Sequence, residues 1–216
     1  AGRSLVLCLE PALPDGSLKT WRKGTLDFRL EARGVSAHAG ADPDRGVNAI
    51  AEMAHQIPLV LEQADLGLGT TLNLGVIRGG TRTNVVPEHC TLLVDGRAKT
   101  TAEGDRLIRS LKALKPILPG AELRVEAAWN RPPMERTPQI AASYEKAKAL
   151  AASLGLPLGE RGTGGASDAN FVAPLGVPVL DGLGGVGEGP HSPGERVLAR
   201  SLAERAALLA ALLTEG

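Results

Sequence analysis

Apolar and polar residues alternate strictly in the segment 24–33, as expected of a strand with one face in solvent. Shorter alternating segments bounded by turn-forming residues predict further strands over 70–77, 90–98 and 122–129. The apolar residues that define the first of these strands are Leu26, Phe28, Leu30 and Ala32.

Two segments between these strands have the spacing of amphipathic helices instead. In the segment 47–61 apolar residues recur every three or four positions, although we expect Pro58 to kink or shorten that helix. A second helix is predicted over 102–115 and ends before Pro116 and Pro119. The order strand, helix, strand, strand, helix, strand predicts a split βαβ unit, in which two helices cover one face of an antiparallel four-stranded sheet.

The flanking segments follow another pattern. Residues 4–9 are almost continuously apolar, as in a strand buried on both faces of a mainly parallel sheet, and residues 177–180 form a second short strand of this type. Helical spacing recurs over 139–154 and 199–213. Two doubly buried strands need more neighbours than these segments supply, so we expect that further residues precede Ala1.

Composition narrows the classes of function. The 216 residues include 24 basic and 24 acidic side chains and are 43% hydrophobic, which suits a folded globular protein. With no net charge and few aromatic residues, the chain lacks the features that nucleic-acid binding needs. The apolar runs are too short to cross a membrane and no signal peptide opens the chain, so we expect a cytoplasmic protein. Cys8 and Cys90 are expected to be reduced, structural cysteines.

Three local features could carry chemistry. Glu10 follows the first apolar strand, at the strand edge where ligand sites of α/β sheets gather, although a solvated acid fits the position equally well. His191 lies in a proline-bounded loop that could aim an imidazole at a metal, although a lone loop histidine is more often simply exposed. Residues 162–168 form a glycine-rich turn whose backbone amides could hold an anionic group, with a tight structural turn as the alternative.

Several short motifs follow one another along essentially the whole chain. They are Leu9-Glu10-Pro11, Arg22-Lys23-Gly24, Ser36-Ala37-His38-Ala39-Gly40, Gly46-Val47-Asn48-Ala49, Gly79-Gly80, Thr83-Asn84-Val85-Val86-Pro87, Asp95-Gly96-Arg97, Gly164-Gly165-Ala166-Ser167-Asp168 and His191-Ser192. Their combination resembles the carboxyl-terminal portion of the di-zinc peptidase and deacylase family that includes glutamate carboxypeptidase, acetylornithine deacetylase and succinyl-diaminopimelate desuccinylase.

The resemblance implies an α/β fold with two domains. Residues 1–23 and 132–216 would form part of a mainly parallel-sheet zinc-hydrolase catalytic domain. Residues 24–131 would form an inserted α+β lid of the split βαβ, ferredoxin-like type, through which the protein forms a homodimer. The same order of elements in the lid follows independently from the periodicity of the sequence.

The resemblance also implies a metal site. Glu10 would bind one of two zinc ions and His191 the other, with cobalt or manganese as possible substitutes. The family's His-x-Asp motif, bridging aspartate and Glu-Glu pair would lie upstream of Glu10, and this sequence contains none of them. A metal pair needs several ligands, so we expect the 216-residue chain alone to be inactive and to bind no metal firmly.

The remaining motif residues would act on the substrate. By resemblance, Asn84 and Arg97 would hold it, with Arg97 gripping a carboxylate through its bidentate guanidinium. Gly165 would present its backbone amide to the substrate, and His38 would stabilise the oxyanion formed during hydrolysis.

The implied function is zinc-dependent hydrolysis of amide bonds in small, carboxylate-bearing peptides or N-acyl amino acids. Whether the substrate is a peptide or an N-acyl amino acid stays open, because Arg97 suits both. The alternative is a protein of another class, a non-catalytic dimerisation or binding module derived from the same family.

Overall fold

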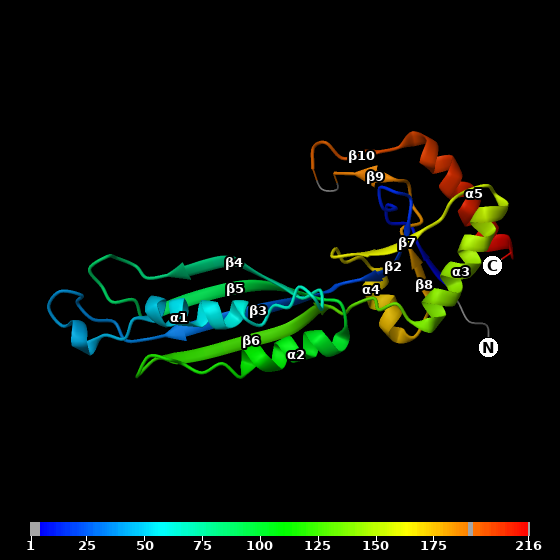
Figure 1. Ribbon diagram of the computed structural model, residues 1–216. Helices are drawn as coiled ribbons and strands as arrows, with labels where there is room; N and C mark the ends of the chain where they lie inside the picture. Colours follow the sequence, from blue (N-terminus) through cyan, green and yellow to red (C-terminus); the bar gives the residue numbers. More distant parts are fainter. Residues whose placement is uncertain (1–4, 190–191, 216) are drawn as a thin grey trace. The chain divides into compact units, whose positions relative to one another are not determined.

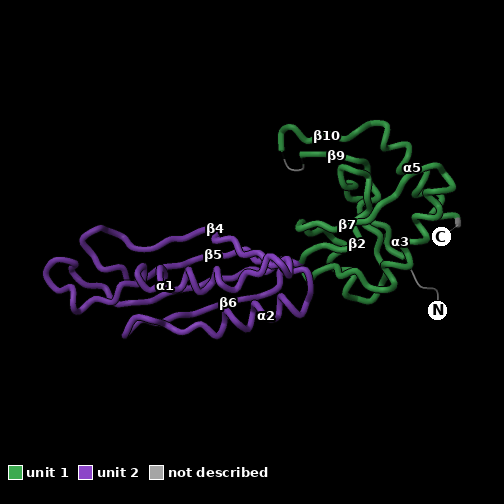
Figure 2. The backbone as a smooth tube through the Cα atoms, viewed as in Figure 1, with its two compact units in different colours: residues 1–23, 131–216 green, residues 24–130 purple. Residues whose placement is uncertain are grey.

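The computed structural model describes residues 5–189 and 192–215, which form a mixed α/β structure (Figure 1). The chain divides into two compact units (Figure 2). Unit 1 comprises residues 1–23 and 131–216, and unit 2 comprises residues 24–130, which interrupt unit 1 in the sequence.

Unit 2 contains a four-stranded sheet whose strands run in the spatial order β4-β5-β3-β6. Strands β3 and β5 are antiparallel, with Gly24 opposite Ala98 at one end and Arg33 opposite His89 at the other. Strand β4 is antiparallel to β5 and its register shifts between Leu74 and Val76. The strands are β3 (Gly24–Arg33), β4 (Thr71–Gly79), β5 (His89–Ala98) and β6 (Glu122–Arg131).

The strands predicted in this region are confirmed, because one side of each pleat is apolar and packs against two helices, α1 (Ala49–Leu61) and α2 (Thr101–Lys112). Asn48 caps α1 by accepting hydrogen bonds from two amides of its first turn, as short polar residues do at helix starts. The core of unit 2 includes Leu26, Phe28, Leu30, Met53, Val60, Leu92, Leu107 and Leu111.

The expectation that Pro58 shortens α1 is wrong. The helix passes through Pro58 and ends at Leu61. Because Pro58 stands in the last turn, the missing amide hydrogen removes a bond only where the helix is about to end. A short 3₁₀ helix, Pro43–Arg45, lies in the loop between β3 and α1.

Unit 1 contains a second sheet, in the order β1-β8-β2-β7. Strand β1 is parallel to β8, and β2 is parallel to β7, whereas β2 and β8 meet in an antiparallel contact at Lys19 and Asp181. The strands are β1 (Val6–Cys8), β2 (Leu18–Arg22), β7 (Glu160–Thr163) and β8 (Val179–Asp181). A two-stranded ladder joins β9 (Gly187–Glu188) to β10 (Arg196–Val197).

The helices of unit 1 are α3 (Pro138–Ser153), α4 (Ala169–Val172) and α5 (Ala199–Glu215), with a 3₁₀ helix at Ala173–Leu175. Helices α3 and α5 contact each other and α3 also contacts β8. The main apolar cluster of this unit contains Leu18, Tyr144, Ala147, Ala151, Leu158, Leu180, Leu183, Leu208 and Leu212.

The prediction that the first apolar segment is buried on both faces is wrong. Val6 to Cys8 are only half-buried, and Leu9 is 60% exposed. The reason is position, because β1 stands at the end of the strand order of the described residues, with β8 as its neighbour. Strand β8, which lies between two strands, is fully buried as expected.

Two further predictions concern single features. Cys8 and Cys90 are free thiols, as expected. Within residues 5–189 and 192–215, the structure contains no helix that is both long enough and apolar enough to cross a membrane.

Candidate active site

A pocket of about 740 Å³ opens in unit 1 where β1 ends. Glu10 and Gly165, two of the residues singled out in the sequence, both line it although they are far apart in the chain. Glu10 is exposed, so its carboxylate is accessible to a ligand. The third candidate of this unit, His191, lies outside the described residues.

Arg22, which lines the pocket, belongs to a buried ion pair that sequence analysis did not anticipate. Arg22 Nε and Nη2 donate to the two carboxylate oxygens of Asp181, at 2.6 and 3.0 Å. The two side chains are 4% and 0% exposed. Ser167 Oγ donates to the same carboxylate at 2.8 Å, and Arg22 Nη1 donates to the carbonyl of Gly165 at 3.0 Å. The charge of Asp181 is therefore fully partnered, which is what a buried carboxylate requires.

A second buried cation, Lys19, lies beside this pair. Its Nζ donates to the carbonyl of Pro11 at 2.7 Å, and the residue is 8% exposed. Burial lowers the pKa of Lys19, as does the nearby Arg22 charge, whereas Asp181 and Glu10 act in the opposite direction. Lys19 thus holds the backbone immediately after Glu10.

The glycine-rich turn is held in place by several hydrogen bonds of its own. The Gly165 amide donates to Thr163 Oγ1 at 3.3 Å, and the Ser167 amide donates to Asn170 Oδ1 at 2.9 Å. The Asn170 side chain in turn donates to the carbonyls of Lys23 and Pro132, at 3.1 and 2.8 Å. The turn is therefore bound to unit 1 both just before and just after the residues of unit 2 in the sequence.

In unit 2 the structure brings His38 and Asn84 together. The Ala39 amide donates to the Asn84 carbonyl at 3.0 Å, and His38 forms an isolated bridge with Val85. The amides of Gly40 and Ala41 donate to His38 Nδ1, at 3.1 and 3.0 Å. Because Nδ1 accepts these bonds, the hydrogen-bond network assigns the proton of the neutral ring to Nε2.

Arg97 lies at the opposite end of the same sheet. It is paired with Thr25 near the start of β3, whereas His38 follows the end of β3 at Arg33. Eight strand residues at about 3.4 Å each separate the two ends by roughly 27 Å. The Arg97 side chain is 32% exposed, and its Nε donates to Asp95 Oδ2 at 2.8 Å. The structure therefore groups His38 with Asn84 but not with Arg97.

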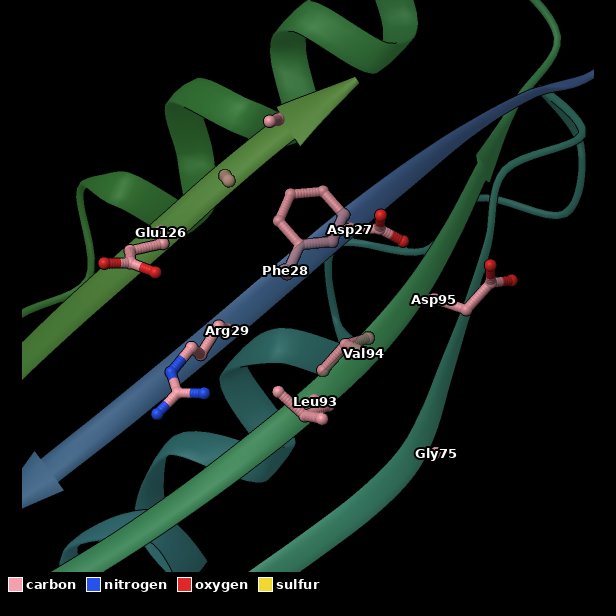
Figure 3. A pocket seen from close by; sticks show the side chains of 10 residues that line it. Asp27, Phe28, Arg29, Gly75, Leu93, Val94, Asp95 and Glu126 are labelled. Carbon is pink, nitrogen blue, oxygen red and sulfur yellow. The ribbon is translucent and has the colours of Figure 1, made fainter. Parts of the chain in front are cut away.

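A further pocket, of about 460 Å³, lies on the sheet of unit 2 (Figure 3). Its lining includes Asp27 and Arg29 of β3, Asp95 of β5 and Glu126 of β6, but none of the residues to which the sequence assigned a role in binding or catalysis. Hydrogen bonds from Asn130 to Asp27 and from Arg97 to Asp95 occupy its acidic groups. We therefore interpret this hollow as a solvated sheet face.

The donors for a metal are too few in the part of the chain that the structure describes. No group of three or more His, Cys, Asp or Glu side chains there could hold a metal ion. Glu10 supplies one carboxylate to the pocket, and a zinc site in a protein needs three or four ligands. These residues therefore do not form a metal site by themselves.

Comparison with known proteins relates most of the chain to peptidases and deacylases. Residues 20–115 match the profile of a family described as a peptidase dimerisation domain. Carboxypeptidase G2 from Pseudomonas sp. strain RS-16 is 30% identical over 191 residues, which cover 87% of this chain and 46% of that protein. Succinyl-diaminopimelate desuccinylase from Cereibacter sphaeroides is 32% identical over 215 residues, which cover 91% of this chain and 54% of that protein. The chain spans about half the length of the curated relatives it matches.

Solved structures show the same fold. Aminopeptidase PepT from Bacillus cereus superposes with a TM-score of 0.78 at 25% identity, covering 95% of this chain and 55% of that chain. A tripeptidase from Staphylococcus aureus gives a TM-score of 0.79 at 21% identity, covering 97% and 56%. The arrangement of elements described above is thus one that known peptidases adopt.

Proposed function

We propose that this chain, a homologue of carboxypeptidase G2 and succinyl-diaminopimelate desuccinylase that carries a peptidase dimerisation domain, contributes to a hydrolase of amide bonds in peptides or N-acyl amino acids. The observation that carries this proposal is the meeting of Glu10 and Gly165 on one pocket of about 740 Å³. A strand-end carboxylate and a glycine amide can bind the two sides of a substrate held between them.

In this proposal each residue has a distinct role. Glu10 is one ligand of a two-zinc site, to which His191 and ligands outside this sequence also contribute. The Gly165 amide donates to the substrate in place of its long bond to Thr163 Oγ1, Asn84 binds the substrate, and Arg97 pairs with its carboxylate. His38, with its proton on Nε2, donates to the oxyanion.

The separation within unit 2 supports a site shared between two subunits. Arg97 lies at one end of the sheet and His38 follows the other, and the ends of β3 at Thr25 and Arg33 are roughly 27 Å apart, whereas a dipeptide spans only about 7 Å. A single lid of ferredoxin-like type therefore cannot present both side chains to one small substrate. We propose that unit 2 forms the homodimer and that His38 and Asn84 act on the substrate of the neighbouring subunit.

The test is an assay of the natural protein that includes this chain and any residues that precede it, against a panel of dipeptides and N-acyl amino acids. We expect hydrolysis of one of the two substrate classes and its loss in Glu10→Ala. The exposed Glu145→Ala on α3 is the control and should keep full activity. Equal activity of Glu10→Ala and the unsubstituted protein would exclude the proposed role of Glu10.

A second candidate function is a non-catalytic dimerisation module. It is favoured by one observation, that the family profile matching residues 20–115 describes dimerisation rather than catalysis. The same assay separates the two, because such a module forms a dimer but leaves every substrate of the panel intact.

A further inference from the structure

Strand β2 carries two buried cations, Lys19 and Arg22, that line the same pocket. Residues three positions apart in a regular strand point to opposite faces. Here the register with β7 shifts, because Lys19 pairs with Arg161 and Trp21 pairs with the next residue, Gly162. Thr20 is thus the extra residue of a β-bulge, and a bulge reverses the alternation of the side chains that follow. The bulge accounts for both cations facing one pocket.

The two cations hold two different segments of the pocket wall. Lys19 Nζ donates to the Pro11 carbonyl at 2.7 Å, and Pro11 directly follows Glu10. Arg22 Nη1 donates to the Gly165 carbonyl at 3.0 Å. Strand β2 therefore binds the backbone at Pro11, next to Glu10, and at Gly165, so it contacts the segments of both pocket residues that the proposed function employs.

Asp181 fixes the orientation of this arrangement. Both of its oxygens bind the Arg22 guanidinium, and a bidentate pair restricts the rotation of both side chains. Ser167 Oγ donates to Asp181 as well, so the glycine-rich turn is tied to the pair at its Gly165 carbonyl and at the Ser167 side chain. Lys19 lies opposite Asp181 in the antiparallel contact between β2 and β8.

We propose that Lys19 and Arg22 are positioning residues that set the spacing across the pocket between the Glu10 segment and the Gly165 turn. The bulge at Thr20 and the carboxylate of Asp181 aim the two cations. This proposal rests on the proposed function in one respect: the spacing matters for catalysis only if Gly165 is the amide donor to a substrate bound beside Glu10. The positioning itself depends only on the contacts within unit 1.

Hydrogen exchange of backbone amides in the natural protein that includes this chain tests the positioning without any assay of activity. Arg22→Lys keeps the charge but loses the bidentate pair and the contact to Gly165, and Ser167→Ala removes one hydroxyl without a buried charge change. In both variants we expect exchange at the Ser167 and Asn170 amides to rise by about fivefold or more, with the strands of unit 2 unaffected. Lys19→Met should accelerate exchange of the Ala12 amide, which donates to Gly185, in the same way.

The matched control is Arg161→Lys. Arg161 lies on the neighbouring strand β7 and pairs with Asp15 at 3.0 Å, but the pair is exposed to solvent. The same substitution there should leave exchange of the turn unchanged. The positioning proposal is overturned if exchange of the turn amides is as slow in Arg22→Lys and Ser167→Ala as in this control. It is also overturned if the two substitutions accelerate exchange equally throughout unit 1. Lys19→Met, which removes the contact to the Pro11 carbonyl, decides the matter if Arg22→Lys does not fold.

Kinetics of the natural protein that includes this chain supply a readout that a merely structural role would not move. A misplaced Gly165 turn weakens substrate binding, so Ser167→Ala should raise KM by about fivefold or more and change kcat by less than about twofold. A structural role lowers the fraction of folded enzyme, which reduces apparent kcat and leaves KM unchanged, and that result overturns the proposal. If the unsubstituted protein cleaves no amide, the proposed function fails, and the exchange experiment alone decides the positioning.

Discussion

In the proposed function, the Arg97 guanidinium of unit 2 binds the carboxylate of the substrate. It is partly exposed, and Asp95 takes the donor on Nε. An arginine side chain offers five donors in one plane, so a neighbouring acid does not exhaust its capacity for a second carboxylate.

We predict that Arg97→Ala in the active natural protein lowers kcat/KM for substrates with a free carboxylate by a factor that corresponds to about 2–5 kcal/mol at most, the usual cost of breaking a hydrogen-bonded charge pair that the bound substrate buries. Esters of the same substrates should be nearly unaffected, because they offer no charge to Arg97. Steady-state kinetics on matched acid and ester pairs measures the difference. Arg29→Ala, a half-exposed arginine paired with Glu31 on the same sheet, is the control. Equal losses for acids and esters would show that Arg97 is structural.

Individual residues of the site were partly predictable from the sequence. Glu10 and Gly165 belong to recognisable motifs, and the structure places both on one pocket. The ion pair between Arg22 and Asp181 was missed, because its partners are 159 positions apart and nothing in a single sequence links them. The available signal was Asp181 itself, a charge at the end of a buried apolar strand.

At the scale of elements, one buried carboxylate joins a helix of unit 2 to a loop. Glu52 of α1 is fully buried and accepts hydrogen bonds from the Gln56 side chain and from the amides of Ile117 and Leu118. Burial acts to raise the pKa of Glu52, but these hydrogen bonds, together with the charge of His55, outweigh it and lower the pKa below its ordinary value of 4.5. Glu52 therefore stabilises the loop in its ionised form.

We predict that Glu52→Gln lowers the free energy of unfolding at pH 7 by about 1–3 kcal/mol. The one oxygen of the Gln amide can accept from both loop amides, but the charge is lost and an NH2 group then faces the Gln56 Nε2 donor, which loses its acceptor. A carboxylate with a depressed folded-state pKa stabilises above its unfolded-state pKa and loses that contribution as the pH falls through the folded-state value. The difference between the two proteins should therefore shrink as the pH falls below about 4.5. Urea unfolding at several pH values measures it.

Glu62→Gln is the matched control for this prediction, because Glu62 follows the same helix and is exposed. It should change the unfolding free energy by less than about 0.5 kcal/mol. A destabilisation by Glu52→Gln that stays constant from pH 7 to pH 3 would show that the lost volume and shape, rather than the lost charge, account for the effect.

The elements themselves were predictable where one face is apolar and the other polar. Strands β3, β5 and β6 alternate in this way and were located correctly. Strand β2 was missed, because its buried residues include Lys19 and Arg22, whose burial depends on partners in distant segments. Strand β7 was missed for a related reason, since its sequence of charged and glycine residues becomes a strand only beside β2.

At the scale of the whole molecule, the two proposed zinc ligands decide how much metal the 216-residue chain can retain. Glu10 and His191 would bind different zinc ions, so each metal would receive a single side chain from this sequence. We predict that the purified chain retains less than stoichiometric zinc after dialysis, as measured by elemental analysis. Two firmly bound zinc ions per chain would contradict the assigned ligands, and a protein that includes the upstream motifs provides the positive control.

The last prediction concerns how two copies of the natural protein complete one site. Arg97 and His38 lie too far apart on one sheet to reach the same small substrate, so we expect His38 to act on the neighbouring subunit. His38→Ala and Glu10→Ala should then each be nearly inactive alone. After mild dissociation and reassembly of the mixture, some activity should return.

The recovery follows from the geometry of a mixed dimer. The subunit that retains Glu10 receives an intact His38 from its partner, whereas the other site carries both defects. At random reassembly of equal amounts, half of the dimers are mixed and each has one intact site, so about a quarter of the wild-type activity is the upper limit expected from the twofold symmetry of a dimer. Mass-tagged subunits verify the exchange. In the control, His38→Ala is replaced by His89→Ala, because His89 is an exposed histidine of the same unit. If subunits exchange and no activity returns, His38 acts within its own chain or takes no part in catalysis.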